Sequence, residues 1–391
     1  ALGWDYIDVI LFTGDAFVDH PSFGTACIAR WLQKWGWRVA VVPQPNWRDD
    51  LRDFKKLGAP RLYFGVNAGA MDSMVNHYTA SKRLRHDDAY TPDGKFGQRP
   101  DYAVSVYSKI LKQLYPDIPV VIGGVEASLR RLTHYDYWKD CLVPSILQWS
   151  GADYLCYGMG EKTMLELTRG IEAGRSRHDM HKIPQIAFYM TGKPKQKEGT
   201  LILHSFEECK KDKRAFAENF HLIETHANMM HPDTLVECVG DGYVQVNPPC
   251  PPATEQEMDS YWDLPFTKLP HPRYKGKRIP AYDMIKFSIN THRGCFGGCN
   301  FCTIAAHQGK FIQSRSEESI LKEVKGLLDL PGFAGNISDL GAPTANMYGM
   351  RGKNPALCDV CRRKSCLFPA PCPNMNRSHE RLLKLYHRVR D

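Results

Sequence analysis

Short, nearly continuous apolar segments recur through the first half of the sequence. They alternate with segments whose apolar residues are spaced as on one face of a helix. Buried strands that alternate with helices are typical of a parallel sheet covered on both faces. The pattern therefore predicts an α/β domain with a doubly wound, Rossmann-like parallel sheet. Its strands are expected at residues 6–12, 38–42, 61–66, 119–122 and 153–157, and its helices at 24–35, 102–115 and from 161 onward.

The ends of these predicted strands carry glycines and polar residues, at 13–15, 65–69, 123–124 and 158–160. In a doubly wound sheet, ligands bind beyond the carboxyl ends of the strands, so these residues can line a nucleotide- or cobalamin-sized cleft. Tight turns explain the same glycines, and this interpretation is favoured because no G-x-G-x-x-G sequence opens the first helix. The polar stretch 67–99 is interpreted either as a lid or substrate contact, or as a loop cross-braced by Arg–Asp pairs.

Proline becomes frequent after this domain, with eight prolines between residues 248 and 280. Proline fixes the local backbone but does not build the interior of a sheet. We therefore expect three parts: an α/β domain over residues 1–192, a proline-rich connector over 193–282, and a second domain over 283–391. Within the connector, a helix is expected near 213–230 and a short strand at 243–246.

The second domain is predicted to begin with a strand, a helix and a second strand. Residues 284–290 alternate as in a strand, a helix with a capping box follows over 314–328, and the next strand is expected at about 334–340. This order is the repeating unit of a (βα) barrel, whose chemistry lies at the carboxyl ends of the strands. A unit takes about 30 residues. We therefore expect only the first part of a barrel here, within a longer protein.

Composition places the chain among ordinary globular proteins, since 43% of its 391 residues are hydrophobic and 24% are charged. No apolar run approaches the roughly 18 residues of a membrane-spanning helix, so no membrane association is expected. The net charge of +8 permits an anionic partner such as RNA without requiring one. The basic segments 193–197 and 210–214 are interpreted as solvated surface. Because there is no secretory signal, the expected location is the cytoplasm.

Three of the thirteen cysteines form the sequence Cys295-x3-Cys299-x2-Cys302, on the loop after the second domain's first strand. Thiolates are soft metal ligands, and metal ligation explains this spacing better than disulfides do in a chain without a secretory signal. An iron–sulfur cluster normally takes four thiolates, so three leave either a distant fourth ligand or an open iron. A structural zinc ion completed by His292 or His307 is the alternative.

This motif, with an aromatic residue before its last cysteine and a barrel strand before its first, resembles the radical S-adenosylmethionine (SAM) superfamily. Within that superfamily the chain is most similar to the YgiQ-type proteins, over nearly its whole length. The resemblance leaves the substrate and the catalytic residues unknown. It is carried by residues 3–5, 14–21, 83–92, 123–128, 293–295 and 338–348.

The resemblance implies a cofactor site. The three cysteines of the motif would hold a 4Fe–4S cluster, and its open iron would bind the amino and carboxylate groups of S-adenosylmethionine. An electron from the cluster would then cleave the cofactor to methionine and a 5′-deoxyadenosyl radical. A small flavodoxin- or ferredoxin-type protein is the expected electron donor. Four further residues would contact the cofactor: Phe301, near its adenine, and Asp339, Gly341 and Thr344, near its amino group.

A second group of cysteines follows as Cys358-x2-Cys361-x4-Cys366-x5-Cys372. Four thiolates this close in sequence can close a tetrahedral zinc site or hold an auxiliary iron–sulfur cluster. Reduced cysteines in a proline-braced insertion are the alternative. A metal is favoured, and its identity stays open.

Two alternatives to this function remain. One is a zinc- or cluster-stabilised module that binds nucleic acid or another partner without catalysis. The other is a cobalamin-dependent radical SAM methyltransferase, because the first domain resembles a cobalamin domain in outline. The ligand sequence D-x-H-x-x-G is missing, since Asp19 and His20 are adjacent and Gly24 follows four residues after His20. Cobalamin is therefore unexpected, although binding without that histidine stays open.

Overall fold

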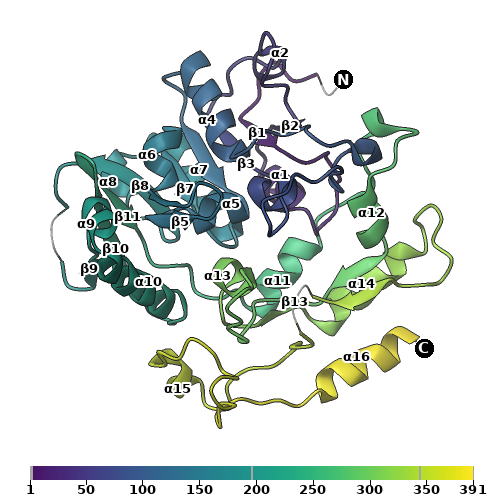
Figure 1. Cartoon of the computed structure of the whole chain (residues 1–391). Coiled ribbons are helices and arrows are strands. Elements are labelled where there is room, and N and C mark those ends of the chain that lie inside the picture. The colour runs from purple at the N-terminus through teal and green to yellow at the C-terminus, as the bar shows by residue number, and fades with distance from the viewer. Residues whose placement is uncertain (1–2, 195–196, 343–344, 391) are drawn as a thin grey trace. The chain divides into compact units, whose positions relative to one another are not determined.

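The computed structural model describes residues 3–194, 197–342 and 345–390, and the chain divides into two compact units (Figure 1). The segment predicted as a connector, residues 193–282, is shared between them. The first unit comprises Ala1–Asn219, Asp233–Cys250 and Leu269–Asp283, and the second comprises Phe220–Pro232, Pro251–Lys268 and Met284–Asp391.

The first unit contains a sheet of nine strands. These are β1 (Val9–Thr13), β2 (Val39–Pro43), β3 (Tyr63–Asn67), β4 (Val120–Gly123), β7 (Tyr154–Cys156), β8 (Ile186–Thr191), β9 (Thr200–Ile202), β10 (Thr234–Val239) and β11 (Gly242–Val246). Their order is β2-β1-β3-β4-β7-β8-β11-β10-β9. The first five strands in this order are parallel to one another, and β8 pairs antiparallel with β7. This confirms the predicted α/β fold class with a largely parallel sheet.

Helices cover both faces of this sheet, as the alternate residues of β1 show. Val9 and Leu11 share a buried cluster with leucines of α1 and α7. On the other face, Phe12 stacks on Phe54 with 5.1 Å between ring centroids, and Phe54 lies 5.8 Å from Tyr107 of α4. The longer helices are α1 (Gly24–Lys34), α4 (Ala103–Leu114), α7 (Glu161–Glu172) and α10 (Lys213–Ala227). Shorter elements are α2 (Arg52–Lys55), α3 (Ser73–His77), η1 (Pro92–Gly94), α5 (Gly124–Leu129), β5 (His134–Asp136), β6 (Cys141–Val143), α6 (Ile146–Ser150), α8 (Arg177–Met180), α9 (Phe206–Lys211), η2 (Pro272–Tyr274) and α12 (Pro280–Ile285).

Three strands of the sheet come from the segment predicted as a connector. β11 pairs antiparallel with β8 and β10, and β9 pairs parallel with β10. Val244 and Val246 are buried, whereas Tyr243 and Gln245 beside them are only partly so, which is the alternation of a half-buried strand. The strand expected at 243–246 is therefore present as β11, but the prediction that this segment lies outside the sheet core is wrong for β9, β10 and β11. The prolines follow the hairpin and do not interrupt it.

The polar stretch 67–99 ends in a buried arginine. Arg99 forms ion pairs with Asp15, which follows β1, and with Asp88. Arg–Asp pairs thus brace this stretch, as the second of its two interpretations, a cross-braced loop, predicts. The basic run 82–86 is exposed and takes no part in these pairs.

The second unit carries the predicted strand–helix–strand order. β12 and β15 pair in parallel, and Ile289 of β12 shares a buried core with Ile320 and Leu327 of α14 and Leu385 of α16. The expected strand 284–290 is shorter than predicted, because Pro280 begins a helix that runs to Ile285. The elements are α11 (Glu255–Trp262), β12 (Ser288–Asn290), β13 (His292–Arg293), α13 (Ile304–Gln308), β14 (Gln313–Ser314), α14 (Glu317–Leu327), β15 (Asp339–Gly341), α15 (Pro355–Asp359) and α16 (Glu380–Arg390).

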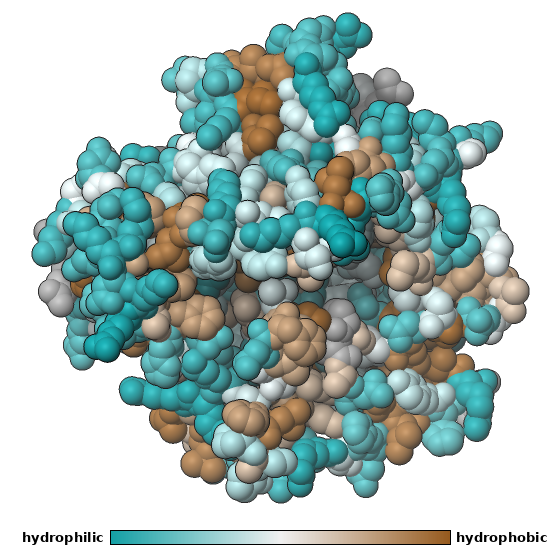
Figure 2. All heavy atoms as spheres, in the orientation of Figure 1, coloured by the Kyte–Doolittle hydropathy of each residue, from teal (hydrophilic) through white to brown (hydrophobic). Residues whose placement is uncertain are grey.

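Hydrophilic side chains cover most of the surface seen in Figure 2, and apolar residues form separate patches. Among the residues that the structure describes, no helix combines the length and the apolar composition needed to cross a bilayer. The most exposed large apolar side chains all belong to the unit that carries the cysteine motifs. They are Phe301, Val360, Phe368, Met284 and Leu328.

Candidate functional site

The first cysteine loop, residues 294–302, follows directly from β13 and is anchored at its base. The amide of Thr291 donates to the carbonyl oxygen of Gly341 at 2.6 Å, which ties the end of β12 to the end of β15. The amide of Cys295 donates to the carbonyl oxygen of Gly309 at 3.0 Å. The loop therefore starts from a fixed position beside the carboxyl ends of two parallel strands, where barrel enzymes place their active sites.

The three thiols of this loop face a common region. A side-chain carbon at Gly297 would lie 3.4 Å from the Sγ of Cys295 and 3.7 Å from the Sγ of Cys299, so both sulfurs lie beside this glycine. The amide of Cys302 donates to the carbonyl oxygen of Cys299 at 3.1 Å and folds the chain back. Burial raises the pKa of the Cys295 thiol, and the neighbouring thiols of Cys302 and Cys299 raise it further because like charges repel. Thiolates that repel one another are suited to a shared cationic centre.

A single zinc ion at this loop would need a fourth ligand, for which the sequence offers His292 or His307. Burial lowers the pKa of His292 to about 4, and its Nδ1 lies 2.9 Å from the Oγ1 of Thr291. The loop itself offers three thiols, one fewer than a closed zinc site or a fully ligated cluster takes.

The residues predicted to contact S-adenosylmethionine lie at different depths. Gly341 is buried at the end of β15 and pairs with Asn290 of β12. Asp339 is exposed at the start of the same strand, and the Phe301 side chain is 91% exposed. Thr344 lies outside the described residues. The structure thus places Gly341 beside the strand that leads into the cysteine loop, and the roles of these residues stay predictions.

Arg315 is a residue of this region that the sequence did not single out. Its side chain is fully buried, donates to the carbonyl oxygen of Asn290 at 2.8 Å and forms an ion pair with Glu323. It also donates to the carbonyl oxygen of Ser319 at 2.9 Å. Arg315 therefore joins the end of β12 to α14. An isolated arginine between serines carries no sequence signal for burial, because arginine is usually exposed.

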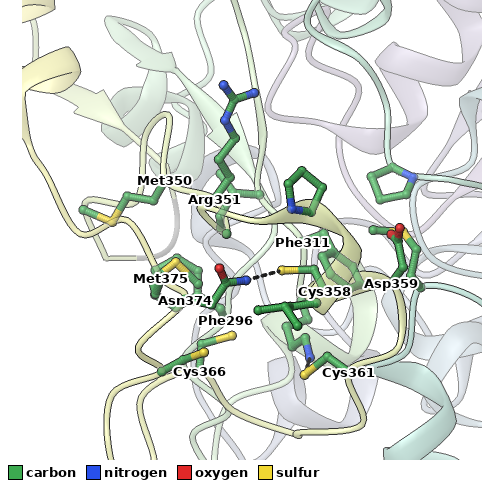
Figure 3. Close-up of a pocket in the computed structure, with 18 of the residues that line it drawn as sticks. Phe296, Phe311, Met350, Arg351, Cys358, Asp359, Cys361, Cys366, Asn374 and Met375 are labelled. Atoms are coloured by element: carbon green, nitrogen blue, oxygen red, sulfur yellow. Dashed lines mark hydrogen bonds between the residues drawn. The ribbon is translucent and has the colours of Figure 1, made fainter.

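The second cysteine loop, residues 358–372, surrounds a cavity of about 480 Å³. All four of its cysteines line the cavity, together with Phe296, Lys310, Met350 and Met375 (Figure 3). The side-chain amide of Asn374 donates to the Sγ of Cys358 at 3.4 Å, as the dashed line in Figure 3 shows. The structure thus brings together the four residues predicted as a second metal site.

The two cysteine loops contact each other directly. The hydroxyl of Ser365 donates to the carbonyl oxygen of Gly297 at 2.6 Å, and the amide of Cys366 donates to that of Phe296 at 3.0 Å. A side-chain carbon at Gly298 would lie 2.8 Å from the Cβ of Ser365. The second loop therefore supports the backbone that carries the first set of thiols.

Replacing Gly294 by alanine is expected to lower the free energy of unfolding by roughly 1–3 kcal/mol. Its φ of +91° disfavours other residues, and an added Cβ would lie 2.3 Å from the carbonyl oxygen of Phe311. Gly297→Ala is the matched control, because an added carbon there makes no contact shorter than 3.4 Å. Urea denaturation of both variants measures the difference. Equal midpoints would contradict the assigned role of Gly294.

Comparison with known proteins decides the family. A sequence profile of the family described as Radical SAM N-terminal matches residues 1–288. The chain belongs to this family. The matched region ends before Cys295, so membership does not by itself test the predicted cluster ligands.

Curated relatives extend the similarity over the whole of this radical SAM chain. The UPF0313 proteins of Porphyromonas gingivalis and Bacteroides thetaiotaomicron are each 57% identical to it, covering 100% and 99% of the chain and 62% and 64% of their own lengths. The UPF0313 protein YgiQ of Escherichia coli is 43% identical over 100% of the chain and 60% of its own length. These matches confirm the predicted resemblance to YgiQ-type proteins. The chain spans about three-fifths of the length of these relatives.

Among solved structures, a similar one is the radical S-adenosylmethionine methyltransferase TsrM from Kitasatospora setae, with cobalamin and a [4Fe-4S] cluster bound. The TM-score is 0.45 at 17% sequence identity, over 87% of this chain and 48% of that one. A likeness of this degree carries no conclusion about the cofactors of the present chain.

Proposed function

We propose that this chain builds the cofactor site of a radical SAM enzyme. Cys295, Cys299 and Cys302 hold a 4Fe–4S cluster, and S-adenosylmethionine binds the iron that has no protein ligand. The observation that supports this most directly is that the sulfurs of Cys295 and Cys299 lie beside the same glycine, 3.4 and 3.7 Å from where a Cβ at Gly297 would stand. Membership of the radical SAM N-terminal family supports the same function. When bound, the cluster supplies the electron that cleaves S-adenosylmethionine to methionine and a 5′-deoxyadenosyl radical. The substrate is not identified.

The chain's own residues hold and orient the cofactors. Gly341 ends a strand beside β12, and the carboxylate of Asp339 lies 3.5 Å from where a Cβ at Gly341 would stand. We therefore assign Asp339 as the acceptor for the amino group of S-adenosylmethionine, with Gly341 leaving room for its approach. The exposed ring of Phe301 is available to pack on the adenine. Arg315 holds the end of β12 in place through the carbonyl group of Asn290. These contacts fix where the cofactor lies before any substrate binds.

The reductant is proposed to be a small flavodoxin- or ferredoxin-type protein. Cys299 is exposed, in contrast to the half-buried Cys295 and Cys302. A cluster held by these cysteines would therefore be approached by a protein electron donor from the side of Cys299.

The test is anaerobic reconstitution of the full-length protein with iron and sulfide, followed by reduction and detection of 5′-deoxyadenosine. The wild type is expected to form 5′-deoxyadenosine. Cys299→Ala is expected to lose about four iron and four sulfide per chain and to fall to the background without enzyme. Cys141→Ala is the matched control, because this exposed cysteine lies in β6, outside both cysteine loops.

Two results would count against this function. If S-adenosylmethionine stays intact in protein that holds a complete cluster, the enzymatic proposal fails. If Cys299→Ala keeps all of its iron, the ligand assignment fails. A corrinoid extracted from the purified protein would favour the methyltransferase alternative.

A further inference from the structure

A buried lysine, Lys310, places a positive charge beside the second cysteine loop. Lys310 is 3% exposed, and its Nζ donates to the carbonyl oxygen of Arg363 at 2.7 Å. The same Nζ lies 3.8 Å from the Sγ of Cys361. No carboxylate among the described residues forms an ion pair with Lys310. A buried ammonium group is costly without a negative partner, so the opposite charge must come from another kind of group.

The thiols of the second cysteine loop can supply that charge. Lys310 and the four cysteines line the same cavity, and Figure 3 labels Cys358, Cys361 and Cys366 among its lining residues. Asn374 directs a second N–H donor, toward the Sγ of Cys358. Donors that point at sulfur favour the thiolate over the thiol. Four thiolates within one cavity repel each other unless a metal centre holds them, and such hydrogen bonds to sulfur are typical of the surroundings of metal-bound thiolates.

The arrangement suits an iron–sulfur cluster better than a single zinc ion. All four cysteines border one pocket of about 480 Å³, which has room for a cluster core larger than a single ion, and its walls include Phe296, Met350 and Met375. Apolar walls of this kind shield a reducible cluster from water.

We propose that Cys358, Cys361, Cys366 and Cys372 ligate a second 4Fe–4S cluster and that Lys310 is its buried counter-charge. Four protein ligands occupy every iron, so this cluster has no open position, unlike the one proposed at the first loop. Four thiolates outweigh the positive charge of the cluster core, and the ammonium group of Lys310 offsets part of the excess.

The second cluster would also hold the first loop in place. Ser365 and Cys366 lie among the second set of ligands and make the hydrogen bonds to Gly297 and Phe296. Closing the second loop around a cluster fixes these contacts. The two sites are nevertheless separate sets of ligands, so each can be removed without removing the ligands of the other.

The test counts metals in the full-length protein after anaerobic reconstitution with iron and sulfide, with zinc measured in parallel. The wild type is expected to hold about eight iron and eight sulfide per chain, and Cys361→Ser and Cys299→Ala about four each. Cys141→Ser should keep the wild-type content, because Cys141 lies outside both loops.

Lys310→Met tests the counter-charge. A nearby cation favours the more negative, reduced cluster, so its loss should keep the iron but shift the reduction potential of the second cluster to more negative values. Lys353→Met is the control, because Lys353 is an exposed lysine of the same unit, with its Nζ 3.5 Å from the carbonyl oxygen of Pro373. An unchanged potential in Lys310→Met would overturn the role of this lysine.

The outcomes separate the two proposals. One zinc per chain in place of the second cluster, or no loss of iron in Cys361→Ser, would overturn the second cluster and leave the radical SAM function intact. Loss of iron in Cys361→Ser, with no cleavage of S-adenosylmethionine by the fully loaded wild type, would support the second cluster and overturn the proposed function.

Discussion

Replacing Arg99 by methionine is expected to lower the free energy of unfolding of the first unit by about 3–5 kcal/mol. Arg99 is 1% exposed and lies between two buried carboxylates. Its Nη2 is 2.8 Å from the Oδ1 of Asp15 and 3.0 Å from the Oδ2 of Asp88. Its Nη1 also donates to the carbonyl oxygen of Ala68 at 2.7 Å. Methionine fills a similar volume, but it leaves both carboxylates buried without a cation.

Urea denaturation at neutral pH, followed by tryptophan fluorescence, measures this loss. Arg85→Met is the matched control: Arg85 is exposed in the same polar stretch, and its replacement should change the stability by less than about 0.5 kcal/mol. Burial raises the pKa of Asp15 to about 6, although Arg99 opposes the shift. Acidification should therefore recover part of the loss, since protonated Asp15 needs no cation. Equal stability of the two variants would contradict the role of Arg99.

The polar stretch 67–99 shows why burial of charge was hard to predict. Its two interpretations, a functional lid and a cross-braced loop, rest on the same residue types. The ion pair that decides between them joins Arg99 to Asp15, which is distant in the sequence. From the sequence alone, the basic residues of the exposed run 82–86 were equally suitable partners for an aspartate. Only the path of the chain distinguishes a buried charge from an exposed one.

The parallel part of the sheet was predictable because burial on both faces leaves a continuous apolar segment, as all five buried residues of β1 show. The strands at the edge of the sheet were harder to predict from the sequence. β9 is three residues long, and β10 and β11 lie next to a proline-rich segment whose composition dominated the interpretation. A short strand gains its place from its neighbours, so its own residues carry little of the signal.

The cysteine loops were predictable for a different reason. Ligands that share a metal centre must lie close in space, and close spacing in sequence is the simplest way to achieve this. Lys310 and Arg315 were missed because a single basic residue gives no indication of what surrounds it. Their contacts with Cys361 and Asn290 arise only when separate segments fold together.

The carboxyl group of Glu237 is expected to have the second large effect on the stability of the first unit. Its side chain is 1% exposed on β10, and its Oε2 accepts a hydrogen bond from the amide of Thr133 at 2.9 Å. Burial raises the pKa of Glu237 to about 7 from an ordinary value of 4.5, although Thr133 opposes the shift. Because the folded pKa lies above the unfolded one, the folded state binds the proton more tightly. The contribution of Glu237 to the free energy of unfolding is therefore largest below about pH 4.5 and falls by about 3 kcal/mol as the pH rises to about 7.

Glu237→Gln removes this titration and keeps an oxygen that can accept from Thr133. The variant is expected to be about 3 kcal/mol more stable than the wild type above pH 7 and equally stable below about pH 4.5. Urea midpoints across this range measure the difference, and Glu207→Gln, at an exposed position in α9, should follow the wild type at every pH. A difference between Glu237→Gln and the wild type that does not change with pH would mean that the carboxyl group does not titrate in this range. The rise of the Glu237 pKa to about 7 on burial would then be wrong.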